Sequence, residues 1–123
     1  IVAEHKDTAT RIALVSDATT PIAARWRIRA FDMAGKSLAE QSAETTLPAL
    51  SATDVAKLDD AALFAGADPA TSYAVAELMI GDAVVSRTII ERGVPKTMRY
   101  PDPGLTATWS GDTVTVRATA LAR

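Results

Sequence analysis

The chain contains no cysteine. Disulfide bonds, thiolate metal sites and cysteine nucleophiles are therefore excluded, but no cellular compartment is selected, because secreted and periplasmic proteins often lack cysteine too. Histidine is almost as scarce, since His5 is the single one. It lies near the chain end without a second imidazole, so we expect a solvated residue there, with no metal site and no serine triad.

Aromatic residues make up only 5% of the 123 residues, so alanine and valine must fill much of any core. Neither sign of charge dominates, and a net charge of −2 gives no electrostatic reason to expect nucleic acid or an anionic membrane as a partner. No apolar run approaches the length of a membrane span, and no signal-peptide pattern opens the chain. The length fits one domain, or one domain plus the beginning of another.

The most regular pattern is the alternation from Ala24 to Ala30, read A-R-W-R-I-R-A. A period of two places side chains on opposite faces of a strand, so Trp26 lies on an apolar face and the three arginines lie on a cationic face. A buried tryptophan on a strand that leads into a hairpin is typical of an immunoglobulin-like β-sandwich. Without cysteine, packing alone must hold the two sheets together.

Further extended segments, separated by turns, predict an all-β, antiparallel fold. The expected strands are 9–15, 22–31, 38–46, 72–80 and 83–92. Gly81-Asp82 between the last two predicts a two-residue hairpin turn, of type II′ because glycine comes first, or a slightly longer loop. Residues 1–7 are polar, and we expect them to be frayed.

The segment after Leu50 is ambiguous. Ser51 and Asp54 resemble a capping box, and Val55, Leu58 and Ala62 recur at helical spacing, which predicts a helix. The alternative is an edge strand over 52–58 that is followed by one helical turn near 60–64. We favour the strand and turn.

Residues 93–104 contain three prolines and two glycines and cannot continue a central strand, so they form a joint. Beyond the joint, 105–121 predicts a hairpin that turns at Ser110-Gly111-Asp112. Its apolar face comprises Leu105, Ala107, Trp109, Val114, Val116 and Ala118. Because an isolated hairpin is marginal in water, we expect this face to dock on the first sandwich or to pair with a second copy of the chain. The chain opens with Ile1 rather than methionine and stops within a strand pattern, so we expect both ends to be cut from a longer protein.

Acidic residues offer no convincing catalytic pair. Asp59 and Asp60 are neighbours at the expected helical turn, where acids interact favourably with a helix N-terminus. Glu40 and Glu44 lie on one face of the strand 38–46, where they can pair across strands with arginine. A glycosidase pair needs a cleft and one carboxyl group in an apolar pocket. We therefore predict no catalytic residue.

Two sets of residues have both a binding and a structural interpretation. Arg25, Arg27 and Arg29 could hold an anionic ligand or a neighbouring domain, but a solvated strand face balanced by glutamates is the simpler hypothesis. Trp26 and Trp109 could stack on sugars. Core packing is favoured for both tryptophans, more strongly for Trp26.

The order of the segments resembles a known family. The similar segments are the strand around Trp26 with its turn at 32–36, then Leu47-Pro48-Ala49-Leu50-Ser51-Ala52-Thr53, Ser86-Arg87, Pro95-Lys96, Pro101-Asp102-Pro103-Gly104-Leu105, and 116–123. Together they resemble the C-terminal region of β-mannosidases of glycoside hydrolase family 2.

The resemblance implies a domain organisation and a role. In that family a catalytic (β/α)₈ barrel is followed by one or two immunoglobulin-like sandwiches. Residues 1–93 would be the first such sandwich, and residues 94–123 the joint and first hairpin of the last one. The catalytic glutamates belong to the barrel and have no counterpart here, so the resemblance implies a non-catalytic accessory sandwich of an enzyme that releases β-linked mannose without a cofactor or a required metal. The implied partners are the barrel and the neighbouring sandwich of the same chain. A carbohydrate-binding or adhesin-type immunoglobulin-like module is the alternative.

Overall fold

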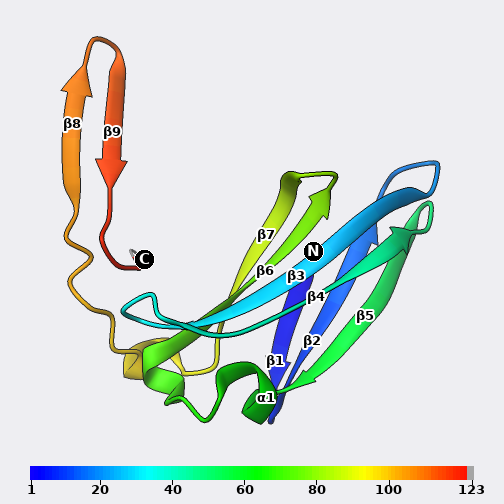
Figure 1. Ribbon diagram of the computed structural model, residues 1–123, viewed down its shortest axis with the longest axis horizontal. Coiled ribbons are helices and arrows are strands. Elements are labelled where there is room, and N and C mark those ends of the chain that lie inside the picture. Colours follow the sequence, from blue (N-terminus) through cyan, green and yellow to red (C-terminus); the bar gives the residue numbers. More distant parts are fainter. Residues whose placement is uncertain (122–123) are drawn as a thin grey trace.

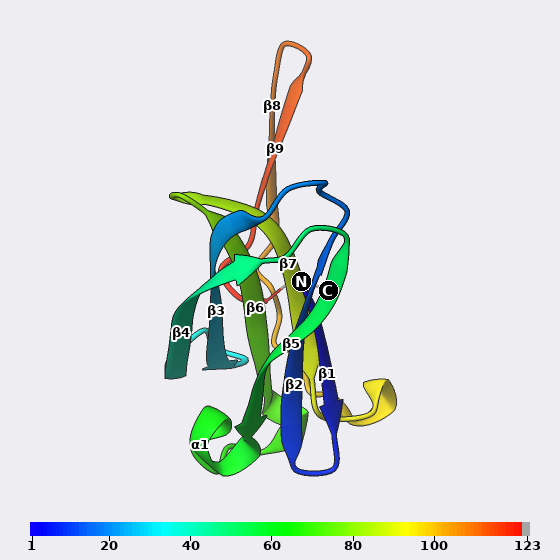
Figure 2. The ribbon, with the colours of Figure 1, turned by 90° about the vertical axis from the view of Figure 1, so that its right-hand side faces the viewer.

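The computed structural model describes residues 1–121, which form two packed antiparallel sheets and a separate hairpin (Figures 1 and 2). The three-stranded sheet has the order β1 (Val2–Lys6), β2 (Ala9–Ser16), β5 (Ser51–Asp59). The four-stranded sheet has the order β4 (Ser37–Leu47), β3 (Ile22–Asp32), β6 (Ser72–Ile80), β7 (Ala83–Glu91). In immunoglobulin lettering the sheets are A-B-E and C′-C-F-G, which confirms the predicted immunoglobulin-like β-sandwich.

The core lies between the two sheets and follows the predicted alternation. Along β3, Trp26 is 7% exposed and Ile28 is fully buried, while the arginines that alternate with them lie on the outer face. The facing strand β2 contributes Ile12 and Leu14, both buried. Trp26 is therefore a core residue on strand C, as the sequence predicted, and small side chains such as Ala76 let the sheets approach around it.

A short helix, α1 (Asp60–Phe64), closes one end of the sandwich. The Asp59 carboxylate accepts a hydrogen bond from the Ala61 amide at 2.8 Å and caps the helix. Leu63 and Phe64 are fully buried and fill the space between the sheets. The strand-and-turn alternative for 51–64 is thus confirmed, and the longer helix is wrong.

The frayed N-terminus predicted for 1–7 is wrong. Val2–Lys6 forms β1 and pairs along its whole length with β2, from Val2 opposite Ala13 to Lys6 opposite Ala9. The two-residue connection begins at Asp7, which has a φ of +56°, a value that aspartate tolerates in tight turns. Backbone pairing with β2 orders a strand that carries few apolar residues of its own.

The turn between β6 and β7 agrees with the prediction. Ile80 pairs with Ala83, so Gly81-Asp82 is a two-residue loop. Gly81 has a φ of +58°, and Asp82 has no positive φ. A positive φ at the first central position alone is the signature of a type II′ turn.

Two single 3₁₀ turns and a separate hairpin complete the described chain. The turns are η1 (Pro69–Thr71) before β6 and η2 (Pro95–Thr97) within the joint. The hairpin comprises β8 (Thr106–Ser110) and β9 (Thr113–Arg117), which is shorter than predicted, and the end of the predicted pattern at 122–123 lies outside the described residues. Both figures show the hairpin extending away from the sandwich (Figures 1 and 2). The predicted docking of the hairpin on its own sandwich is therefore wrong for this structure.

Candidate functional site

An ionic cluster occupies the outer face of the four-stranded sheet. The strand register places Arg27, Glu77 and Arg87 in one row across β3, β6 and β7. The Glu77 side chain is 1% exposed. Its Oε2 accepts from Arg27 Nη2 at 2.7 Å and from Arg29 Nη2 at 3.2 Å, and its Oε1 pairs with Arg87 Nη2 at 2.8 Å. Three guanidinium groups from two neighbouring strands thus cover one carboxylate.

The electrostatics keep this carboxylate ionised. Burial by itself raises the pKa of Glu77, but hydrogen bonds from Arg27 and Arg87 and the positive charges of Arg29 and Arg27 outweigh it, so the pKa lies below its usual value. A general acid in a glycosidase needs the opposite shift, toward a protonated carboxyl at working pH. Glu77 therefore acts as a structural counter-ion.

The arginines of β3 do not pair as the sequence suggested. The register does place Arg25 opposite Glu44 and Arg29 opposite Glu40. However, within residues 1–121 the side-chain hydrogen bonds of Arg25 and Arg29 lead to β6, where Arg29 donates to Glu77 and the Arg25 Nη2 lies 3.4 Å from Met79 Sδ. A glutamate does balance this face, but it is Glu77 rather than the predicted Glu40 and Glu44. A buried carboxylate attracts a guanidinium more strongly than an exposed one at a sheet edge, because less water screens the pair.

Sequence reasoning missed Glu77. A signal existed in the run Tyr73-Ala74-Val75-Ala76-Glu77-Leu78-Met79-Ile80, where one acid interrupts an otherwise apolar strand. A charged side chain at such a position is rarely buried unless it is paired. Its partners come from strands 10 and 48–50 residues away in sequence, so only the sheet order reveals them.

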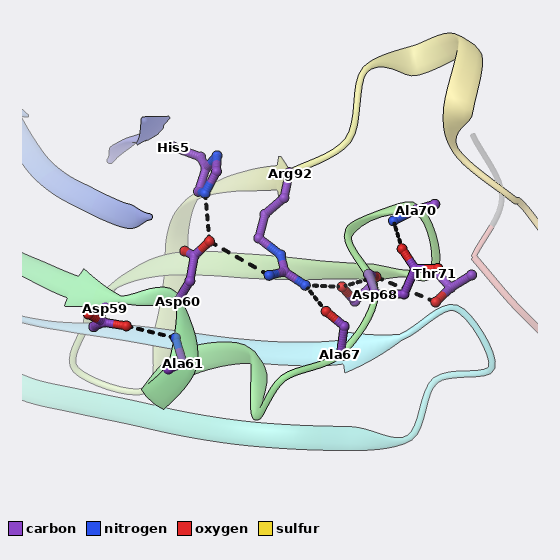
Figure 3. Close-up of polar contacts among 10 residues, drawn as sticks. His5, Asp59, Asp60, Ala61, Ala67, Asp68, Ala70, Thr71 and Arg92 are labelled. Carbon is purple, nitrogen blue, oxygen red and sulfur yellow. Dashed lines mark hydrogen bonds and ion pairs between the residues drawn. The ribbon is translucent and has the colours of Figure 1, made fainter. Parts of the chain in front are cut away.

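A second polar cluster joins the two sheets at the α1 end (Figure 3). The His5 Nε2 donates to Asp60 Oδ2 at 2.9 Å, and Arg92 Nη1 lies 3.6 Å from the same oxygen. Arg92 also donates to the Ser72 hydroxyl at 2.8 Å, and its guanidinium lies 3.8 Å from the centroid of the Phe64 ring. The cluster cross-links β1, α1, the start of β6 and the end of β7.

The expectation of a solvated His5 is therefore wrong, since its side chain is only 17% exposed. The two neighbouring aspartates, Asp59 and Asp60, also have different structural roles. Asp59 caps α1, and Asp60 bridges His5 and Arg92. No hydroxyl or thiol nucleophile is hydrogen-bonded to His5 in the described chain, so the cluster resembles a structural clamp more than a hydrolytic site.

Shallow hollows occur on the surface of residues 1–121. One of about 540 Å³ lies at the β1–β2 turn between charged residues that include Lys6, Arg11 and Lys57. Another, about 400 Å³, lies between the β3–β4 turn and the joint, and its wall includes Asp32 and Tyr100. A third, about 320 Å³, lies beside the Gly81-Asp82 turn. These open surfaces suit contact with a larger partner better than enclosure of a reacting group.

Within residues 1–121, no group of three or more histidine, aspartate or glutamate side chains is placed to hold a metal ion. No helix of this region is long and apolar enough to cross a membrane.

The two tryptophans have opposite environments. Trp26 is in the core, but Trp109 on β8 is 79% exposed. Its register partner Val114 is 54% exposed and lies on the same face of the hairpin. The predicted packing of Trp109 is therefore wrong within the described residues, and the apolar face of the hairpin is open to a partner.

These features define an immunoglobulin-like sandwich whose buried charges are used for structural pairing. Residues 8–96 match the model of the mannosidase Ig/CBM-like domain, and the chain belongs to this family. No curated protein matches the chain. The domain is a non-catalytic accessory module of mannosidase-like enzymes.

Proposed function

We propose that this domain is a packing module of a family 2 β-mannosidase, a retaining glycosidase that releases terminal β-linked mannose without a cofactor or metal. Its partners would be the catalytic barrel and the neighbouring sandwich of the same parent chain. Family membership supports the mannosidase context. The resemblance of the turn at 32–36 and of the segments at 47–53 and 95–105 supports the narrower assignment.

The Glu77 cluster is the observation that carries a packing role. It fixes Arg27 and Arg29, which are 25% and 32% exposed, in one arrangement on the outer face of the sheet. Side chains already held in place lose little conformational entropy when a second surface covers them. Each guanidinium also has five N–H donors, more than the contacts with Glu77 use. A partner surface that presents carbonyl or carboxylate oxygens would fit this face.

The hairpin supports the proposed second domain. Residues 94–123 would be the joint and the first hairpin of a C-terminal immunoglobulin-like sandwich. Leu105, Trp109 and Val116 are 58%, 79% and 62% exposed, as expected for one half of a core whose other half is supplied by another sheet. Threonines occupy the opposite face, which suits contact with water.

Two experiments test the proposal. The reading frame that encodes the chain should also encode a barrel-sized segment upstream with two catalytic glutamates, and a frame without one would contradict the family 2 assignment. The purified chain should release no product from an aryl β-mannoside at high protein concentration. Turnover that persists after host glycosidases have been removed would instead place catalysis in this domain.

A carbohydrate-binding role is a second candidate, because one hollow has suitable chemistry. The hollow beside the joint presents the Tyr100 side chain, which is 42% exposed, together with Asp32 and Arg99. The Asp32 carboxylate is held by the amides of Ala34 and Lys36 at 3.0 and 2.9 Å. An aromatic ring with nearby charged hydrogen-bonding groups is a common arrangement in small-molecule sites.

Titration of mannobiose into ¹⁵N-labelled chain tests this role. Saturable shifts at Arg99 and Tyr100 that disappear in Tyr100→Ala, but persist in Trp109→Ala, would support sugar binding. Unchanged spectra at tens of millimolar sugar would contradict it.

A further inference from the structure

The joint, residues 93–104, has proline-rich composition but is folded against the sandwich. Met98 is only 9% exposed. The Arg99 amide donates to the Ala70 carbonyl at 2.8 Å, and the Tyr100 hydroxyl donates to Glu91 Oε1 at 2.9 Å. Backbone and side-chain contacts therefore attach three consecutive residues of the joint to β7 and to the η1 turn.

Gly93 explains how the chain turns back so closely. A Cβ atom added at Gly93 would lie 2.6 Å from Met98 Sδ and 3.3 Å from the Pro69 carbonyl oxygen. Gly93 does not have a positive φ, so its backbone conformation is open to other residues. A side chain at position 93 would therefore require the Met98 side chain to move away and the Pro69 carbonyl to yield slightly. Gly93 and Met98 thus form a close packing contact at the start of the joint.

The far end of the joint is attached to the base of the hairpin. The Gly104 amide donates to Asp102 Oδ1 at 2.9 Å, and the Thr119 amide donates to the Pro103 carbonyl at 2.8 Å. The short stretch between the two attached ends contains Pro101 and Pro103, whose rings fix φ. A flexible linker would instead be rich in glycine and serine. Little rotational freedom remains between sandwich and hairpin.

We infer that the joint is a rigid coupler, which holds the apolar face of the β8–β9 hairpin in one fixed position relative to the first sandwich. The contact between Gly93 and Met98 locks the coupler. A sheet that covers Trp109 and Val114 would then be oriented by the sandwich itself. The fixed position of the hairpin depends only on contacts within this chain. The inference therefore does not require that the parent protein is a β-mannosidase.

Distance measurements between two spin labels test the coupler. The chain has no native cysteine, so Ser42→Cys on β4 and Thr106→Cys at the start of β8 give two unique sites, both exposed. A label at the start of β8 lies next to the joint, so fraying at the hairpin tip does not contribute. We expect one narrow distance distribution for the otherwise unchanged protein.

Three variants of the labelled chain complete the test. Gly93→Ala displaces Met98, and Met98→Ala removes it, so both should lose the single narrow distribution. Val94→Ala is the matched control, since Val94 belongs to the same joint but is 56% exposed, and it should leave the distribution unchanged. Circular dichroism checks that each sandwich remains folded.

Two results would overturn the inference. A broad distribution in the chain with an unchanged joint would show that the joint is a flexible linker. Narrow distributions in both Gly93→Ala and Met98→Ala, with the sandwich folded, would show that the Gly93–Met98 contact does not lock it.

Discussion

Replacement of Glu77 by glutamine should destabilise the sandwich strongly although the two side chains have nearly the same shape. The substitution removes the negative charge at the centre of the ionic cluster and creates no cavity. Arg27, Arg29 and Arg87 would then lie together without a counter-ion. Mutual repulsion and incomplete hydration of these guanidinium groups should raise the free energy of the folded state.

The magnitude follows from the exposure of the partners. Loss of one partner from a fully buried ion pair costs about 3–5 kcal/mol. Here the partner side chains are 25%, 32% and 59% exposed, so water recovers part of that loss. We therefore expect Glu77→Gln to lower the free energy of unfolding by roughly 2–3 kcal/mol, a large share of the 5–15 kcal/mol of a typical domain.

Urea denaturation at pH 7 measures this effect. Trp109→Phe in all proteins leaves Trp26, which is buried, as the single tryptophan reporter of unfolding. With a typical urea dependence for a small protein, the midpoint should fall by about 1–2 M. The matched control is Glu44→Gln, an exposed glutamate of the same sheet that also lies opposite an arginine in the register. It should change the free energy by at most about 0.5 kcal/mol.

Equal midpoints for Glu77→Gln and Glu44→Gln would refute this reasoning. They would mean that the arginines find other partners or sufficient water when the carboxylate is lost. The Glu77 cluster would then have no special part in holding the outer face of the sheet.

Four other outcomes are expected. Trp26→Ala should cost about 3–5 kcal/mol by calorimetry, because it empties the centre of the core, and a nearly unchanged melting temperature would contradict the core assignment. Folding lowers the pKa of Glu77, so the ionised Glu77 stabilises the folded state at neutral pH. This stabilisation is lost as the pH falls below the ordinary glutamate pKa of about 4.3 and through the lowered value. The free energy of unfolding, measured against pH in acid, should therefore show this decrease in the native chain but not in Glu77→Gln. His5→Ala should cost about 1–2 kcal/mol and accelerate hydrogen exchange of the β1 amides, whereas exchange unchanged from the native chain would show that the clamp does not hold β1. Light scattering should detect concentration-dependent association of the chain that is absent in Trp109→Ser and in a chain ending at Gly93; a monomer in all three would show that the exposed hairpin face does not pair with a second copy.

The sequence predicted those parts of the fold that depend on local alternation. The pattern around Trp26 identified a core strand, and Gly81 identified a tight hairpin, because both signals lie within a few residues. The strand at 2–6 was missed because its order comes from pairing with β2 and from the bond between His5 and Asp60, 55 residues away. A polar strand of this kind has no apolar pattern to detect.

The candidate site was predictable only in part. The two-residue alternation of the strand predicts that Arg25, Arg27 and Arg29 face outward. The identity of their counter-ion depends on the strand order β4-β3-β6-β7, which no local pattern specifies. The sequence pattern therefore points to Glu40 and Glu44 on the adjacent strand instead of Glu77. Trp109 shows the same limit, since an alternating strand pattern indicates an apolar face without indicating what covers it.

The position of Glu40 and Glu44 has a consequence for solubility. Both lie on β4, which is an edge strand of the four-stranded sheet, and both are exposed. An edge strand offers unpaired backbone groups to any passing chain, and charges along it discourage such pairing. Glu40 and Glu44 thus discourage another chain from adding a strand at this edge of the sheet. Strands β8 and β9 carry a single charge between them, Arg117, so aggregation of this chain should begin at the hairpin.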